Sequence, residues 1–243
     1  MRWRLSIEGD NRASLFHRST TAGLKMDAIL NFPISSHLQV DVAPAISLRS
    51  GSHQSFDGSS GPKNSILLNE AAVGWGPLSW LHIRAGALNQ RALHSGLVVG
   101  ARPFPALRGE SLFYLQDLEF RLRAEKAVPS SESLSSNTSQ MEETPSLEAA
   151  VLEINWKSSP RRTWMNRIGV YQFNNLPTAV ATESSLKGNT VDSLSETESA
   201  FRYKFYGLEG ASHLRWPAIS QLDLLLFVEA ARNQAAPAGL NTA

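Results

Sequence analysis

Residues 37–49 alternate between apolar side chains and polar or small ones. The even positions are all apolar, and the odd positions include His37, Gln39, Asp41 and Ser47. Successive side chains of a strand point to opposite faces, so the pattern predicts a strand with one apolar and one polar, solvent-facing side. A soluble strand usually has ~5–6 residues, whereas a tilted membrane-spanning strand needs roughly 9–11. The length of this stretch therefore indicates a membrane-spanning strand.

The same alternation recurs along the chain and predicts about ten strands. They span Arg2–Glu8, Ala22–Phe32, 37–49, Ser65–Trp75, Trp80–Leu88, Leu115–Lys126, Ala149–Lys157, Arg162–Phe173, Ala200–Trp216 and Ser220–Arg232. The pattern of Leu115–Lys126 also suits a helix. Pro44 predicts a bulge or an edge position, because proline cannot donate to the ladder. We expect an all-β fold: one antiparallel up-and-down transmembrane β-barrel over residues 1–243, with its closure left open.

Long polar connections separate some of these strands. They cover Gly9–Thr21, Ser50–Asn64, 89–111, 128–146 and 174–199. Segment 89–111 is expected to fold into the lumen, with a short helix around Gln90–Leu93. It is followed by a second long connection, although short turns and long loops should alternate between the two ends of a barrel. Either 89–111 contains one more crossing, or Leu115–Lys126 does not span, or one periplasmic connection is long.

Composition excludes several classes of protein. Lys and Arg number 23 and Asp and Glu 22, which argues against a nucleic-acid binder held by bulk charge. The chain has no cysteine, so it forms neither a disulfide framework nor a thiolate metal site. No stretch approaches 18 consecutive apolar residues, which excludes a transmembrane helix.

The two ends of the sequence bear on its location. The residues after Met1 already alternate and are no secretory signal, and the final residues lack the aromatic that usually ends a bacterial outer-membrane protein. We interpret the chain as a piece of a longer precursor located in the bacterial outer membrane. The alternative is a cytosolic protein that never had a signal.

No motif for catalysis or cofactor binding stands out. There is no phosphate-binding loop, no GxSxG elbow and no HExxH, and the six histidines are scattered. His213 and Asp223 could face one another across the last hairpin, as in outer-membrane enzymes, but a plain cross-strand polar pair is favoured. We therefore expect no enzyme activity, no metal and no cofactor.

Charged side chains on the wet faces are the better functional signal. The candidates for lining a pore are Lys25, Asp27, Asp41, Arg49, Glu70, Arg84, Glu119, Arg121, Arg123, Arg167, Arg202 and Lys204. Glu70 is expected opposite Arg84. Mixed acids and bases around a channel create a transverse field that sets selectivity, and a dry sandwich core would not hold so many charges. The alternative for each residue is an ion pair that merely fills a narrow barrel.

Aromatic residues gather near the predicted strand ends. Trp3, Phe32, Trp75, Trp80, Trp156 and Trp216 are candidates for an aromatic girdle, and Trp164 lies near a strand end as well. Such residues favour the membrane–water interface. The alternative is that they pack the ends of a soluble sandwich.

Three short segments carry a resemblance. In chain order they are Leu68-Asn69-Glu70-Ala71, Ala85-Gly86-Ala87-Leu88-Asn89-Gln90 and Pro103-Phe104-Pro105-Ala106-Leu107-Arg108. A fourth segment, Tyr171–Pro177, adds to them. With these motifs the chain resembles porin-like proteobacterial outer-membrane β-barrel proteins of the Bdellovibrio type. The resemblance implies a larger barrel, of which part is absent here, and defines no catalytic residue.

Three functions follow, in order of preference. The first is a porin-like channel for passive diffusion of small solutes, with outer-membrane lipid as its surroundings and homo-oligomerisation left open. The second is a surface-exposed structural or adhesive barrel without transport. The third is a soluble β-sandwich that binds a ligand such as a carbohydrate, and a barrel enzyme comes last.

An arginine at Val40 or Val42 tests the lipid assignment. If the even face of 37–49 meets lipid near the midplane, either substitution destabilises the folded chain by ~2–4 kcal/mol, because a charge enters hydrocarbon. Denaturant unfolding in lipid vesicles measures the difference. A change near zero would remove this face from the lipid.

Overall fold

The computed structural model describes residues 2–13, 17–55, 58–60, 65–99, 103–129, 144–159, 162–177, 181, 191–194, 199–219 and 222–235. These residues are nearly all in β-strands, and neighbouring long strands pair antiparallel in an up-and-down order, which confirms the predicted fold class. No helix in the described part of the chain is long and apolar enough to cross a membrane. The chain divides into two compact units, Met1–Gly74 and Trp75–Ala243.

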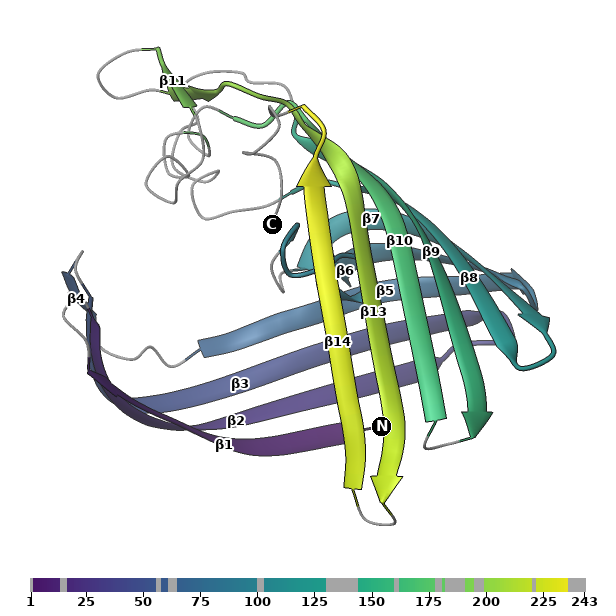
Figure 1. Cartoon of the computed structure of the whole chain (residues 1–243), viewed down its shortest axis with the longest axis horizontal. Helices are drawn as coiled ribbons and strands as arrows, with labels where there is room; N and C mark the ends of the chain where they lie inside the picture. Colours follow the sequence, from purple (N-terminus) through teal and green to yellow (C-terminus); the bar gives the residue numbers. More distant parts are fainter. Residues whose placement is uncertain are drawn as a thin grey trace. The chain divides into compact units, whose positions relative to one another are not determined.

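In the first unit, three long strands lie side by side (Figure 1). β1 (Arg2–Ala13) pairs with β2 (His17–Pro33), which pairs with β3 (Leu38–Ser55). β4 (Gly58–Ser60) pairs with the end of β3, and β5 (Ser65–Leu78) follows β3 in the strand order.

The register of β2 and β3 sorts their side chains by polarity. Leu24 lies opposite Leu48, and Met26 lies opposite Ile46. On the other face Asn31 lies opposite Asp41, and its Nδ2 donates to Asp41 Oδ1 at 2.6 Å. The first unit therefore has one apolar and one polar face, as the alternation predicted.

Pro44 interrupts the ladder without shifting it. The pairs Asp27–Ala45 and Leu30–Val42 stand in the same register on either side of the gap. β3 also has neighbours on both sides in the strand order. The expectation of an edge position at Pro44 is therefore wrong, and β3 has no bulge there against β2. The missing proline N–H removes a bond from the ladder, and the paired residues on either side keep the strands aligned.

In the described part of the second unit, seven long strands follow one another in sheet order (Figure 1). They are β6 (Leu81–Asn89), β7 (Pro103–Leu115), β8 (Leu118–Ala127), β9 (Ser146–Ser159), β10 (Arg162–Asn174), β13 (Phe205–Ile219) and β14 (Leu222–Asn233). A small separate sheet pairs β11 (Val191–Ser193) with β12 (Ser199–Phe201). A short 3₁₀ helix, η1 (Gln90–Ala92), follows β6.

The long strands of the second unit have two contrasting faces. On β8, Glu119, Arg123 and Glu125 are buried, whereas Leu122 between them is 50% exposed. The register carries the same division to the neighbouring strands, because Arg108 faces Glu125 and Ser111 faces Leu122. We call the first side the charged face and the second the apolar face.

The main difference from the sequence-based expectation lies within 89–111. Residues 103–111 belong to strand β7, so this segment contains an additional strand, which is one of the explanations that the order of loops left open. Its short strand signal was hidden by Pro103, Pro105 and Gly109. With β7 in place, short and long connections alternate along the second unit. The short connections lie at one end of the strands and the longer connections at the other; the short ones are 79–80, 116–117, 160–161 and 220–221.

Other boundaries move because polar strand ends also pair. Residues 9–13 and 17–21 extend β1 and β2, and residues 50–55 extend β3, although they had been expected in loops. Backbone hydrogen bonds form these extensions without an apolar face. Residues 202–204 separate β12 from β13, so the predicted strand Ala200–Trp216 is two elements. Part of the predicted loops 128–146 and 174–199 lies outside the described residues.

Gly207 provides a test of the β13–β14 pairing. A Cβ there would overlap the backbone carbonyl oxygen of Arg232 and lie 2.9 Å from the Tyr171 hydroxyl. Gly207→Ala should therefore destabilise the fold by about 1–3 kcal/mol through overpacking. Denaturant titration measures the change.

Gly109→Ala is the matched control for Gly207→Ala. Gly109 also lies within a long strand, but its added Cβ would meet nothing within 4 Å. Its unfolding free energy should stay within about 0.5 kcal/mol of the parent, as for a substitution that disturbs no packing. Equal losses in both variants would contradict the described register.

Candidate functional site

Ion pairs join neighbouring strands across the charged face of the second unit. Arg108 on β7 donates from Nε to Glu125 Oε2 on β8 at 2.6 Å, and the two side chains are 3% and 0% exposed. Arg108 Nη2 also donates to the backbone oxygen of Asn89 at 3.2 Å. The pair therefore fixes β7 to β8 and holds the chain where it leaves β6.

A second group of charges continues across β7, β8 and β9. Arg123 donates from Nε to Glu110 at 2.7 Å and from Nη1 to Glu153 at 3.3 Å. Asn155 Nδ2 donates to Glu153 at 2.7 Å and to Glu119 at 3.2 Å. Each buried carboxylate of this group thus accepts hydrogen bonds, which offsets the free energy lost when a charge leaves water.

The segment Gln90–Val99 folds back onto the charged face. His94 Nδ1 lies 2.7 Å from Glu209 Oε1, and the Ser95 amide donates to Glu209 Oε2 at 2.7 Å. The Ser95 hydroxyl donates to Glu229 Oε2 at 3.0 Å. Arg123 Nη1 donates to the Ala92 carbonyl at 3.0 Å. The folded-back segment is therefore attached to β8, β13 and β14 at once. It begins with the short helix η1, which confirms the helix expected around Gln90–Leu93, and its place in a lumen stays a prediction.

An apolar cluster holds the same segment from the side. Leu93 and Val99 are buried against strand residues of the charged face. The strand residues of this cluster are Phe104, Ala127, Leu147, Ala149, Val151 and Tyr171. Because they lie toward the strand ends that carry the long connections, the charged face changes from ionic to apolar along its length.

Several predicted pore-lining residues lie on this face. Glu119, Arg121 and Arg123 alternate along β8, and Arg121 Nη2 donates to Glu119 at 2.9 Å. Arg84 and Arg167 share the face, because Arg84 faces Arg108 and Arg167 faces Glu153.

In the first unit, three more candidates lie on the polar face. Lys25 Nζ is 3.4 Å from Asp27 Oδ2, and Asp41 is buried. Arg49 belongs to β3, but its side chain lies outside the described residues. Glu70 belongs to the first unit and Arg84 to the second, so the pair expected between them stays a prediction.

Arg202 and Lys204 lie outside the long strands. Both precede β13, and Arg202 donates from Nε to Asp192 Oδ1 on β11 at 2.8 Å. This hydrogen bond raises the pKa of the exposed Arg202 guanidinium above its usual value. These two residues therefore belong to the connection between β10 and β13 rather than to the charged face.

The register also separates His213 from Asp223. His213 lies opposite Phe227, and its Nε2 is 3.6 Å from Glu229 Oε1, whereas Asp223 accepts a 2.9 Å hydrogen bond from Arg215 Nε. The cross-hairpin pair considered for these residues was wrong because the turn is displaced by two residues from the assumed centre.

Aromatic side chains gather on the apolar face beside the short connections. Trp80 stacks on Phe113 with ring centroids 6.0 Å apart, Trp164 faces Trp156, and the Arg162 guanidinium lies 4.6 Å from the centre of the Trp216 ring. Trp75, Trp80, Trp164 and Trp216 are all exposed. In the first unit Phe32 is exposed as well, whereas the side chain of Trp3 lies outside the described residues.

Sequence reasoning missed several residues of the site. Arg108 and Glu110 were assigned to a loop, because prolines and glycines obscured β7. Glu153 and Glu209 stand at alternate positions among apolar neighbours, so the two-residue period alone could have placed them on the charged face. The contact of Glu209 with His94 and Ser95 had no signal in the sequence, because it joins residues more than a hundred positions apart.

The described residues contain no group of three or more His, Cys, Asp or Glu arranged to hold a metal ion. Neither a protein-family model nor a curated protein sequence matches the chain.

Removal of the Glu209 carboxylate tests what holds the folded-back segment. Glu209→Ala leaves His94 and the Ser95 amide without their buried acceptor, so we expect a loss of about 3–5 kcal/mol in stability. Hydrogen–deuterium exchange should accelerate in residues 90–99 more than in β9 or β10. Asp192→Ala is the control, because its partner Arg202 is exposed and the change should stay below ~1 kcal/mol. Unaltered exchange in residues 90–99 of Glu209→Ala would show that the apolar cluster alone holds the segment.

Proposed function

We propose that the chain forms an outer-membrane β-barrel through which small solutes diffuse passively, without a catalytic step. The observation that carries this proposal is the reversed polarity of the second unit. Arg108, Glu125 and Glu209 are buried, while Ile168 is 61% exposed and Leu226 52% exposed. In a water-soluble protein, ionised groups stay outside and large alkyl groups pack inside. Hydrocarbon around the apolar face and polar surroundings along the charged face make this arrangement favourable.

The two ends of the strands support a membrane setting. In the second unit, short connections gather at one end and long ones at the other, as in outer-membrane barrels. Tryptophans lie beside the short connections, and on β13 Tyr206 lies at the opposite end from Trp216. The ten residue-to-residue steps from Tyr206 to Trp216, at ~3.3 Å each and a tilt of about 40°, correspond to a height of roughly 25 Å, which is the height of the apolar band of such barrels.

The charged face would determine which solutes pass. Its strands present about as many bases as acids in the described part of the second unit. The bases are Arg84, Arg108, Arg121, Arg123, Lys157, Arg167 and Arg215, and the acids are Glu110, Glu119, Glu125, Glu153, Glu209, Asp223 and Glu229. A wall with balanced charge excludes neither cations nor anions, so discrimination would come mainly from size. The folded-back segment occupies part of this face and would narrow the path.

A specific observation favours the second function, a surface barrel without transport. Arg108, Arg123, Glu125 and Glu153 are buried and paired with one another or with neighbours, as expected of side chains that fill an interior. A channel and a barrel whose interior is filled by side chains differ in whether ions cross the refolded protein.

Planar-bilayer recordings of the refolded chain test the proposal. We expect discrete conductance steps with a potassium-to-chloride permeability ratio close to one, because the charges of the face balance. Replacement of residues 90–99 by a short Gly-Ser linker should increase the step size at least about two-fold, since the segment narrows the path.

Electrophoretic migration separates the alternatives. A membrane barrel should migrate differently in detergent before and after heating. Heat-modifiable migration without conductance steps would favour the surface barrel. A monomer that folds in water without detergent and does not enter vesicles would contradict the membrane assignment as a whole.

A further inference from the structure

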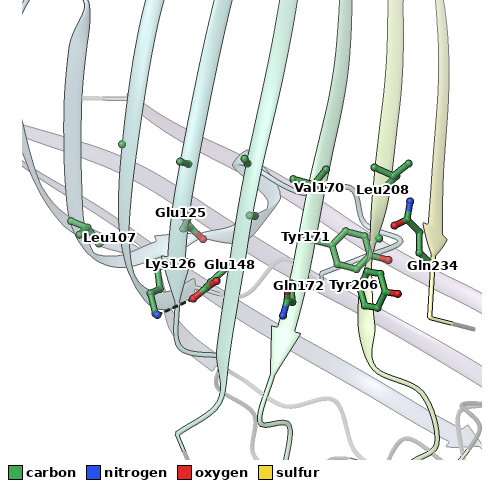
Figure 2. A pocket seen from close by; sticks show the side chains of 15 residues that line it. Leu107, Glu125, Lys126, Glu148, Val170, Tyr171, Gln172, Tyr206, Leu208 and Gln234 are labelled. Atoms are coloured by element: carbon green, nitrogen blue, oxygen red, sulfur yellow. Dashed lines mark ion pairs between the residues drawn. The ribbon is translucent and has the colours of Figure 1, made fainter.

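The apolar face of the second unit carries a hollow with a volume of about 670 Å³ (Figure 2). It extends over β7, β8, β9, β10 and β13 near the ends that carry the long connections. Most of its lining residues project from the apolar face, and Glu125, Ala149, Tyr171 and Gly207 alternate with them along the strands. The hollow is therefore separate from the charged face on the other side of the sheet.

Small residues produce the hollow. Gly109, Ala124 and Ala150 lie on neighbouring strands, and a Cβ on Gly109 would meet nothing within 4 Å. Larger apolar side chains, among them Leu107, Val170 and Leu208, also line it. A volume of this size is in the range of small-molecule sites, roughly 300–1,000 Å³. The surface is therefore suited to an alkyl chain rather than to a polar solute.

The border toward the strand ends is polar. Lys126 Nζ lies 2.8 Å from Glu148 Oε1, and these side chains are 70% and 49% exposed. Figure 2 shows this ion pair at one side of the hollow, with Gln172 and Tyr206 farther along the same border. An exposed ammonium group and an exposed carboxylate thus stand side by side, next to an apolar surface.

We propose that this hollow binds one zwitterionic phospholipid, with an acyl chain along Gly109, Ala124 and Ala150 and its head group at Lys126 and Glu148. This inference rests on the proposed membrane location. The lysine ammonium faces the lipid phosphate, and the glutamate carboxylate faces the lipid ammonium. The adjacent opposite charges of the protein match the adjacent opposite charges of the head group.

The same pair disfavours other occupants. A phospholipid whose head group carries only negative charge would bring its phosphate close to the Glu148 carboxylate, and like charges in contact reduce affinity. A second copy of the chain would place its own lysine against Glu148 and its own glutamate against Lys126 only if the two hollows met in opposite orientation. The test therefore measures both lipid preference and oligomeric state.

Native mass spectrometry of the refolded chain in mixed micelles tests the inference. The micelles contain equal amounts of phosphatidylethanolamine and phosphatidylglycerol with identical acyl chains. We expect one retained lipid per protein, with phosphatidylethanolamine preferred several-fold. Glu148→Gln should turn the preference toward phosphatidylglycerol, because the lysine then stands without its carboxylate.

Filling the hollow provides the matched comparison. Ala124→Phe places a ring in the hollow and should lower lipid retention on the order of ten-fold, which corresponds to about 1.4 kcal/mol. Ala230→Phe adds the same ring to the apolar face of β14, outside the hollow, and should retain lipid like the parent chain. Ala150→Leu replaces Ala124→Phe if the latter does not fold.

The outcomes distinguish the two proposals. Three results would each overturn the inference. They are equal lipid retention by Ala124→Phe and Ala230→Phe, a preference of the parent chain for phosphatidylglycerol, and a dimer without bound lipid. If the parent chain enters vesicles and shows heat-modifiable migration but retains no lipid, the lipid site alone is wrong. A chain that does not enter vesicles overturns the proposed function and the lipid site with it.

Discussion

Ion pairs between neighbouring strands are the interaction on which the rest of the second unit depends. Arg108 with Glu125 and Arg123 with Glu110 align β7 and β8, and Glu153 extends the same network to β9. The two β7–β8 pairs join residues at facing register positions, and the Arg123–Glu153 pair joins diagonal neighbours on β8 and β9. A shift of either register would separate these partners, and an unpaired buried charge is strongly destabilising. The network therefore specifies the register more tightly than the apolar face does, where one alkyl side chain can replace another with little loss.

The folded-back segment depends on the same ionic face. Glu209 and Glu229 accept hydrogen bonds from its backbone and side chains, and Leu93 and Val99 fit the apolar end of the face. A segment without a long regular element acquires its position from strands distant in the sequence. The charged face thus has two roles, since it aligns the strands and also positions the chain that covers it.

The two-residue period alone predicts most of the fold. It identifies the faces of β3, β6 and β8 correctly, because polar and apolar residues alternate there without interruption. It fails for β7, where Pro103, Pro105 and Gly109 dilute the signal, and for the polar ends of β1, β2 and β3, where backbone pairing needs no apolar face. The charged residues Glu119 and Arg123 follow from the same period. The contacts of His94 and Ser95 do not, because they require knowledge of which distant strands meet.

The distribution of tryptophan has a spectroscopic consequence. Five tryptophans stand beside the short connections of the second unit: Trp75, Trp80, Trp156, Trp164 and Trp216. All of them except Trp156 are exposed. Tryptophan fluorescence from this unit therefore reports only the strand ends that carry the short connections. It does not report the opposite ends, where Tyr206 is the corresponding aromatic. Emission wavelength and quenching of these tryptophans would therefore report the surroundings of a single edge of the sheet.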